Sequence, residues 1–170
     1  MVKISFLMIL LVGQFSFLLQ AAKPNIDFSG NWVLVDKAAI SGHLYANSVP
    51  NRLVLTQTKD SIIFERQGLN QNGVSVTSME SLPFDGGSVG AYTVARRKKM
   101  SSVKWVSGGQ ALVETSIYMN PTDESKVDVV MSDSLFFNAV GKELVVTRRN
   151  ISNIGESWCV KATYKMDHQK

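Results

Sequence analysis

The sequence predicts an all-β domain: an antiparallel meander of nine or ten strands that forms a lipocalin-like barrel, with a β-sandwich as the alternative. Apolar and polar residues alternate with a period of two from Phe28 to the end of the chain, and turn residues separate the alternating segments. This alternation places successive side chains on opposite faces of a sheet, and a sheet with one wet face is typically antiparallel. Closing such a sheet removes its exposed edges, which favours the barrel.

The N-terminal 22 residues have the three parts of a secretory signal peptide. Lys3 supplies a positive charge, an apolar run extends from Ile4 to Leu19, and Gln20-Ala21-Ala22 ends in small residues. The alternative is a transmembrane anchor, but the run is shorter than the ~20 residues that a spanning helix needs, and Gln14 interrupts it. We therefore expect cleavage, one domain over residues 23–170, no stable membrane anchor, and an extracytoplasmic location, either periplasmic or secreted.

The alternating segments define the expected strands in chain order. Their shared faces carry Phe28, Gly30, Trp32 and Leu34; Leu53 and Leu55; Ile62 and Phe64; Val113, Thr115, Ile117 and Met119; Val127, Val129 and Met131; Leu144 and Val146; and Trp158, Val160, Ala162, Tyr164 and Met166. Residues rich in Gly, Asn and Asp lie between them, as tight hairpins require. The segment from Asp36 to Pro50 shows neither pattern, so we expect a long loop or a short helix that covers one end.

The first strand carries a specific motif. Residues 28–34 follow a Phe-x-Gly-x-Trp-x-Leu pattern, which resembles the opening strand of the calycin barrels, the lipocalins and fatty-acid-binding proteins, and the layout of the chain is similar to small exported bacterial lipocalin-like domains. The resemblance implies that Gly30 lets the chain bend, that Trp32 closes one end, and that Arg148 packs on Trp32. Fatty-acid-binding proteins hold the ligand carboxylate with an Arg-x-Tyr motif, but here that segment reads Ala162-Thr163-Tyr164.

Composition and residue spacing speak against several function classes. The chain has 18 Lys and Arg against 14 Asp and Glu, a net charge of +4, and its basic run at Arg96–Lys99 is typical of a solvated hairpin or edge strand, so we expect no nucleic-acid partner. The two histidines, His43 and His168, have no Gly-x-Ser-x-Gly elbow to pair with. Cys159 is the only cysteine, and no residues stand at metal-ligand spacing. We expect no catalytic residues, metal or cofactor.

The remaining candidates are side chains that face the barrel interior. Arg66 is in phase with Ile62 and Phe64, and Arg148 with Val146, so both point inward unless they lie near strand ends and reach solvent. A barrel of about eight strands has room for one small ligand. The predicted ligand-binding residues are Trp32, Arg66, Trp105, Met119, Arg148, Trp158 and Tyr164.

These residues lead to one expected function and one alternative. We expect an exported, non-enzymatic protein that binds a small, largely apolar molecule inside the barrel. The alternative is an extracytoplasmic β-rich module that contacts a protein or a polysaccharide through Arg96–Lys99 and Tyr92. The sequence does not identify a protein partner.

Overall fold

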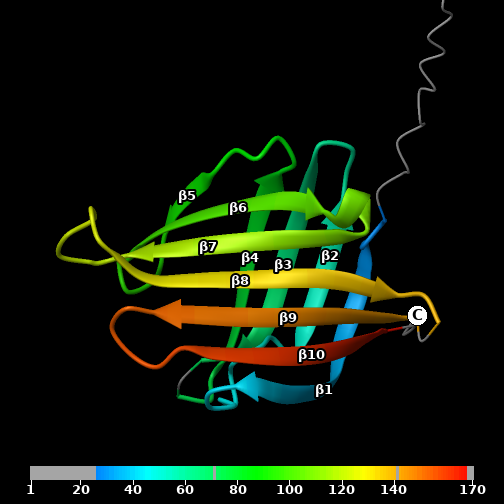
Figure 1. Ribbon diagram of the computed structural model, residues 1–170, viewed down its shortest axis with the longest axis horizontal. Coiled ribbons are helices and arrows are strands. Elements are labelled where there is room, and N and C mark those ends of the chain that lie inside the picture. The colour runs from blue at the N-terminus through cyan, green and yellow to red at the C-terminus, as the bar shows by residue number, and fades with distance from the viewer. Residues whose placement is uncertain (1–25, 71, 141, 168–170) are drawn as a thin grey trace, which may run out of the picture.

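The computed structural model describes residues 26–70, 72–140 and 142–167. In this part of the chain ten strands follow one another, with a single short 3-10 turn, η1 (Ser107–Gly109), between the sixth and seventh (Figure 1). The strands are β1 (Gly30–Ser41), β2 (Arg52–Gln57), β3 (Ser61–Leu69), β4 (Ser75–Pro83), β5 (Val89–Tyr92), β6 (Lys98–Val106), β7 (Ala111–Met119), β8 (Val127–Asn138), β9 (Glu143–Ser152) and β10 (Trp158–Met166). The expected signal peptide and His168 lie outside the described residues.

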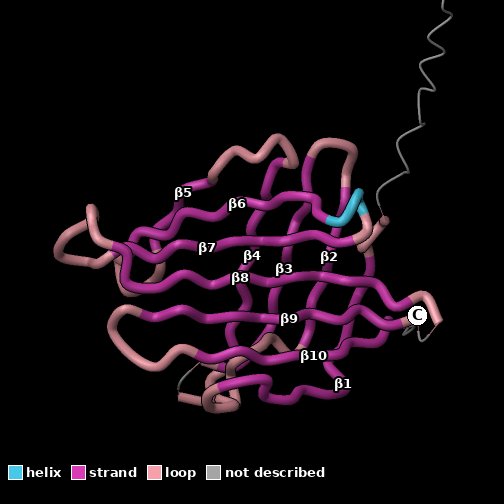
Figure 2. The backbone as a smooth tube through the Cα atoms, in the orientation of Figure 1, coloured by secondary structure: helices cyan, strands magenta, loops and turns pink. Residues whose placement is uncertain are grey.

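The ten strands form one antiparallel sheet in the order β4-β3-β2-β1-β10-β9-β8-β7-β6-β5. Because β1 pairs with β10, the two halves of the meander join, and the sheet curls into a nearly closed barrel (Figure 2). β4 and β5 are its edge strands, and β4 comes into contact with β6 across the gap. The predicted all-β meander and barrel are therefore confirmed. In the described residues no helix is long and apolar enough to span a membrane.

The segment of uncertain type at Asp36–Pro50 contains no helix. Residues 36–41 continue β1, and a turn-rich segment follows before β2 begins at Arg52. The register of β1 against β10 shifts between Leu34 and Asp36 and again between Ala39 and Ser41. Such irregularities bend a strand and increase its twist, so β1 can curve along the wall of the barrel.

Gly30 allows a close approach at the start of β1. Its φ is +153°, and a Cβ at this position would lie 3.0 Å from Met166 Cε and 3.1 Å from Trp32 Nε1. Only glycine adopts this backbone conformation without strain. Gly30 thus leaves room for the side chains of Trp32 and Met166 beside the backbone at the start of β1.

An apolar core fills one end of the barrel. Trp32 and Tyr164 are its largest members, and both are fully buried. The indole Nε1 of Trp32 donates to the Phe28 carbonyl at 3.0 Å, so its polar atom is satisfied. Trp105 packs against the rings of Phe28 and Phe84, with centroids 5.9 Å and 5.3 Å away. These aromatic rings close this end of the barrel.

Candidate functional site

A layer of charged side chains lies inside the barrel next to the apolar core. Most of its members stand two residues from a buried apolar residue of the same strand, as Arg66 does from Phe64 and Glu114 from Leu112. Side chains two residues apart point to the same face of a strand, so the residues of this layer face inward. The charged layer consists of Arg66, Glu80, Lys99, Glu114, Asp133 and Arg148.

The charged layer is held together by ion pairs between strands. Arg148 makes a bidentate contact with Asp133, in which Nε donates to Oδ1 at 2.6 Å and Nη2 to Oδ2 at 2.5 Å, from β9 to the neighbouring β8. Arg66 on β3 donates to Glu114 on β7, across the interior. Lys99 Nζ lies 2.6 Å from Glu80 Oε2, which joins β6 to β4 across the gap in the sheet. These three contacts pair every member of the charged layer.

The three carboxylates of the charged layer differ in their proton affinity. Burial raises the pKa of Glu114, and the neighbouring charge of Asp133 adds to this effect against the attraction of Arg66. Burial also acts to raise the pKa of Asp133, but the charge and hydrogen bonds of Arg148 hold it below its ordinary value. Burial opposes ionisation of Glu80 too, and hydrogen bonds from Lys99 and Ser101 still bring its pKa below the usual range.

We expect acid to remove the stability that Glu80 contributes. Because its pKa is lowered in the folded state, its contribution is complete above the unfolded pKa of about 4.3 and is lost as the pH falls below that value. Glu114 has the opposite effect on stability. Its pKa is raised in the folded state, so protonation at low pH favours the folded state over the unfolded one. The difference in Tm between the wild type and Glu80→Gln should therefore be largest near pH 7 and shrink towards pH 3. A difference that stays constant in thermal melts over this range would contradict the assignment.

Three cavities surround Arg148 at the end of the barrel opposite the aromatic rings. The largest, the mouth cavity, has a volume of about 680 Å³ and is lined by Tyr45, Ala46, Asn47, Ser48, Met131, Arg148 and Trp158. An inner cavity of about 120 Å³ adjoins it and is lined by most of the charged layer together with Ser78, Ser116, Tyr118 and Met131. A third cavity of about 160 Å³ lies between Arg148 and the β3–β4 hairpin. Most of the charged layer lines the inner cavity, the layer meets the mouth cavity at Arg148, and we call it the floor of the site.

The segment between β1 and β2 forms one rim of the mouth cavity. Lys37 Nζ donates to the Ala46 carbonyl at 2.6 Å, and the Tyr45 hydroxyl lies 3.0 Å from Glu156 Oε2. Arg148 Nη1 donates to the Ser48 carbonyl at 3.2 Å. This rim is thus tied both to the barrel wall and to the charged layer, so its position depends on Arg148.

Three of the predicted ligand-binding residues line these cavities. Arg66, Arg148 and Trp158 do so, and the side chains of the two arginines are only 13% and 11% exposed. Both arginines therefore face the interior, and the alternative in which they reach solvent is wrong. Trp32, Trp105 and Tyr164 instead belong to or pack against the apolar core. Whether any of these residues binds a ligand stays a prediction.

Met119 does not line the three cavities, because the predicted inward face of β7 is wrong. Leu112, Glu114 and Ser116 are the buried residues of this strand. Their alternates, which include Val113 and Ile117, point to the outer face, and a register shift follows between Tyr118 and Met119. Val113 and Ile117 therefore lie outside, while Glu114 and Ser116 take the inward positions at the level of the charged layer.

The contact between Arg148 and Trp32 that the resemblance implies is not made. The Arg148 guanidinium donates to Asp133 and to the Ser48 carbonyl. Trp32 has an edge-to-face contact with Phe137, with centroids 6.1 Å apart. Trp32 lies in the apolar core and Arg148 in the charged layer, at different levels of the barrel.

Sequence reasoning missed the four other members of the charged layer, Glu80, Lys99, Glu114 and Asp133. Lys99 belongs to the run at Arg96–Lys99, for which we expect a solvated hairpin or edge strand. Their positions did carry a signal, because Glu80 is in phase with Leu82 and Asp133 with Leu135. A search for charges in phase with the apolar core would have found them.

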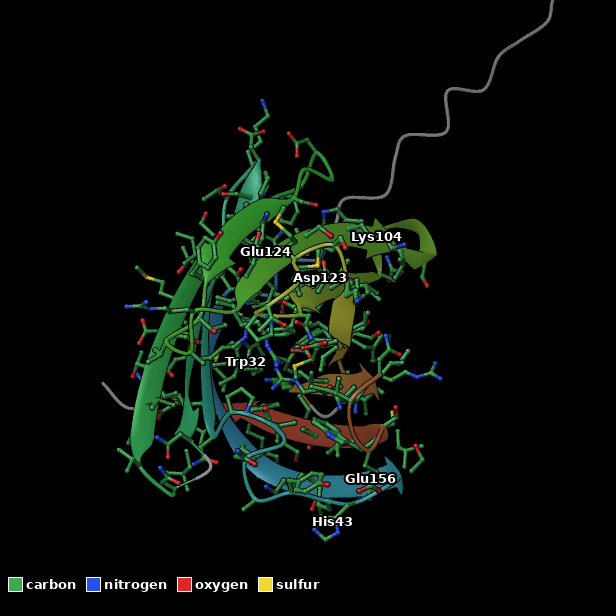
Figure 3. The ribbon with its side chains drawn as sticks, turned by 90° about the vertical axis from the view of Figure 1, so that its left-hand side faces the viewer. Trp32, His43, Lys104, Asp123, Glu124 and Glu156 are labelled. Carbon is green, nitrogen blue, oxygen red and sulfur yellow. The ribbon has the colours of Figure 1, made fainter. Side chains whose placement is uncertain are left out.

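The other candidates stand apart from this site. Figure 3 shows His43 beyond β1, pointing away from the barrel interior; its ring packs on Tyr45, with centroids 4.6 Å apart. Cys159 is a half-buried free thiol. In the described part of the chain no group of three or more His, Cys, Asp or Glu side chains could hold a metal ion.

The basic run at Arg96–Lys99 is mostly engaged in ion pairs. Arg97 contacts Asp128 at 3.1 Å, Lys98 contacts Glu124 at 3.0 Å, and Lys99 belongs to the charged layer. These acidic partners cancel most of the positive charge that the alternative function requires. The structure therefore gives no specific support to a basic docking surface.

A scan against protein-family models matches no family, and a search of curated proteins finds no significant match. The nearly closed antiparallel barrel is compatible with the lipocalin-like resemblance, which thus rests on the fold and on the motif of the first strand.

Proposed function

We propose that this protein is a non-enzymatic binding protein that holds one small polar molecule in the mouth cavity. The observation that carries the proposal is the arrangement of the barrel interior. Aromatic rings close one end, and the other end holds a cavity of about 680 Å³ that meets the layer of buried ion pairs at Arg148. This volume lies within the range of roughly 300–1,000 Å³ that small-molecule sites have.

The lining favours a polar ligand over the apolar one that the sequence suggested. An apolar molecule on the floor of the site would displace water from Arg66, Arg148 and their carboxylate partners. It could not replace the hydrogen bonds that this water makes. Such desolvation costs several kcal/mol for each ion in an apolar environment. A polar ligand can make hydrogen bonds in place of those of the displaced water molecules.

The proposal also places the protein outside the cytoplasm, either in a periplasm or secreted. Its support is the sequence pattern of residues 1–22, which lie outside the described residues. The test is the mass of the protein recovered after export. We expect the mature chain to begin at Lys23.

We expect native mass spectrometry of the protein, isolated from cells that produce it, to reveal a bound molecule that Met131→Trp removes. Met131 lines both the mouth and inner cavities, so an indole at this position fills the space that the ligand needs. Met119→Trp is the matched control, because Met119 lines none of the three cavities. Circular dichroism would show that both variants fold.

Two results would contradict the proposal. One is retention of the bound molecule by Met131→Trp at the same level as by Met119→Trp. The other is a wild-type protein that carries no added mass and whose NMR spectrum is unchanged by a metabolite extract of the producing cells.

A further inference from the structure

We infer that the ligand of the mouth cavity is an uncharged, hydroxyl-rich molecule, a sugar or a polyol with a single ring. This inference rests on the proposed function and names the chemical class of its ligand. Three independent features of the site support it: the charge balance of the floor, the aromatic wall and an unpartnered hydroxyl on the rim.

The floor of the site has no charge to offer to an ionic ligand. The three cations of the charged layer face three carboxylates, so their formal charges cancel. An anionic or cationic ligand would have to break one of these pairs and leave its partner buried and uncompensated, which is strongly unfavourable. A hydroxyl group is both donor and acceptor, so it can accept a hydrogen bond from Arg148, which lines the mouth cavity, while the ion pair with Asp133 stays intact.

The wall of the mouth cavity is aromatic. Trp158 and Tyr45 both line it, and their ring centroids lie 6.2 Å apart at an interplanar angle of 58°. The hydroxyl of Tyr45 is held by Glu156, which fixes the ring in place. Aromatic faces pack against apolar surfaces and polarised C–H groups, and a sugar or cyclic polyol presents C–H faces together with a rim of hydroxyls. One ligand of this class matches both the wall and the floor.

The rim provides a buried hydroxyl without a partner. Ser48 is 3% exposed and lines the mouth cavity, and its Oγ has no hydrogen-bond partner among the described residues. Buried polar atoms are nearly always hydrogen-bonded, so an exception calls for an explanation. Asn47, the neighbour of Ser48, also lines the mouth cavity and adds an amide there. A ligand hydroxyl supplies the missing partner.

Isothermal titration calorimetry and ¹⁵N NMR can test this ligand class with defined probes. The neutral probes are glucose, galactose, mannose and myo-inositol; the ionic probes are phosphate, citrate and glycine betaine; dodecanol is the apolar probe. We expect at least one neutral polyol to bind, to shift the amide signals of Ser48 and Trp158, and to keep its affinity between about 0.05 and 0.5 M NaCl, since no ion pair forms with the ligand.

We expect Trp158→Ala to weaken this binding by about tenfold, as the loss of one aromatic contact does. Ser48→Ala should weaken it by a similar factor through the loss of one hydrogen bond. Tyr92→Ala is the control, because Tyr92 is exposed on the edge strand β5 and lines none of the three cavities. Thermal melts would verify that each variant folds.

The possible outcomes separate this inference from the proposed function. Salt-sensitive binding of an ionic probe at Ser48 and Trp158, with no response to the polyols, would overturn the ligand class but leave a polar binding site. Binding of dodecanol alone would overturn both. Binding of none of the probes would overturn the ligand class, while the native mass spectrum and the metabolite extract decide the proposed function. Equal affinity of a polyol for the wild type and Trp158→Ala would also overturn the inference.

Discussion

Arg148→Met is expected to lower the free energy of unfolding by about 3–5 kcal/mol, because it leaves a buried carboxylate without its partner. Asp133 is 6% exposed and receives two hydrogen bonds from Arg148. The substitution also removes the donor that holds the Ser48 carbonyl at the rim. Urea denaturation at pH 7, followed by tryptophan fluorescence, measures the loss.

Two further variants identify the cause of this loss. Lys98→Met breaks the exposed pair between Lys98 and Glu124, whose side chains are 38% and 46% exposed, and should leave the free energy of unfolding almost unchanged, because solvent screens an exposed pair. The double variant Arg148→Met, Asp133→Leu should regain much of the stability, because it removes the uncompensated charge. A loss for Arg148→Met as small as for Lys98→Met would show that water solvates Asp133 in the inner cavity.

The fold could be predicted largely from local patterns. Alternation identified seven of the ten strands, all except β4, β5 and β6, and turn residues located the hairpins that give a meander. The inward faces of β3, β9 and β10 were also predicted correctly, because Ile62, Leu144 and Val160 are each buried in the apolar core. In these strands the rule that apolar residues face inward holds along most of the length, and so alternation is sufficient to assign the face.

The site was harder to predict because the interior changes from apolar to charged along the barrel axis. In β7 the residues Val113 and Ile117 point outward while Glu114 points inward. Alternation shows that a strand has two faces, but it does not say which one is inside when the interior is polar. Leu112, buried and in phase with Glu114, was a local sign of the correct face.

Local sequence patterns do not predict which residues of the charged layer form ion pairs with one another. Arg66 and Glu114 are 48 residues apart in the chain and on opposite sides of the barrel. Their contact exists only because the sheet curls until β3 and β7 face one another. The rim between β1 and β2 is likewise positioned by tertiary contacts, such as that of Ser48 with Arg148, and its own residues show no periodic pattern.

Trp32→Ala is expected to destabilise the protein as strongly as the loss of the buried ion pair, by about 3–5 kcal/mol. The indole is 1% exposed and fills the centre of the apolar core next to Phe28 and Phe137. Its removal leaves a cavity that the neighbouring strands cannot fill, because hydrogen bonds on both sides hold β1 between β2 and β10. Urea denaturation at pH 7 measures this loss.

Val33→Ala is the matched control on the same strand, since Val33 points to the outer face and is 37% exposed. Alternation predicts a loss of less than about 1 kcal/mol for this neighbour. The contrast between adjacent residues tests the inward face of β1 directly, and Trp32→Phe should fall between the two because it keeps a ring in the core. Similar losses for Trp32→Ala and Val33→Ala would mean that the first-strand tryptophan does not close the barrel, and the structural basis of the lipocalin-like resemblance would be lost.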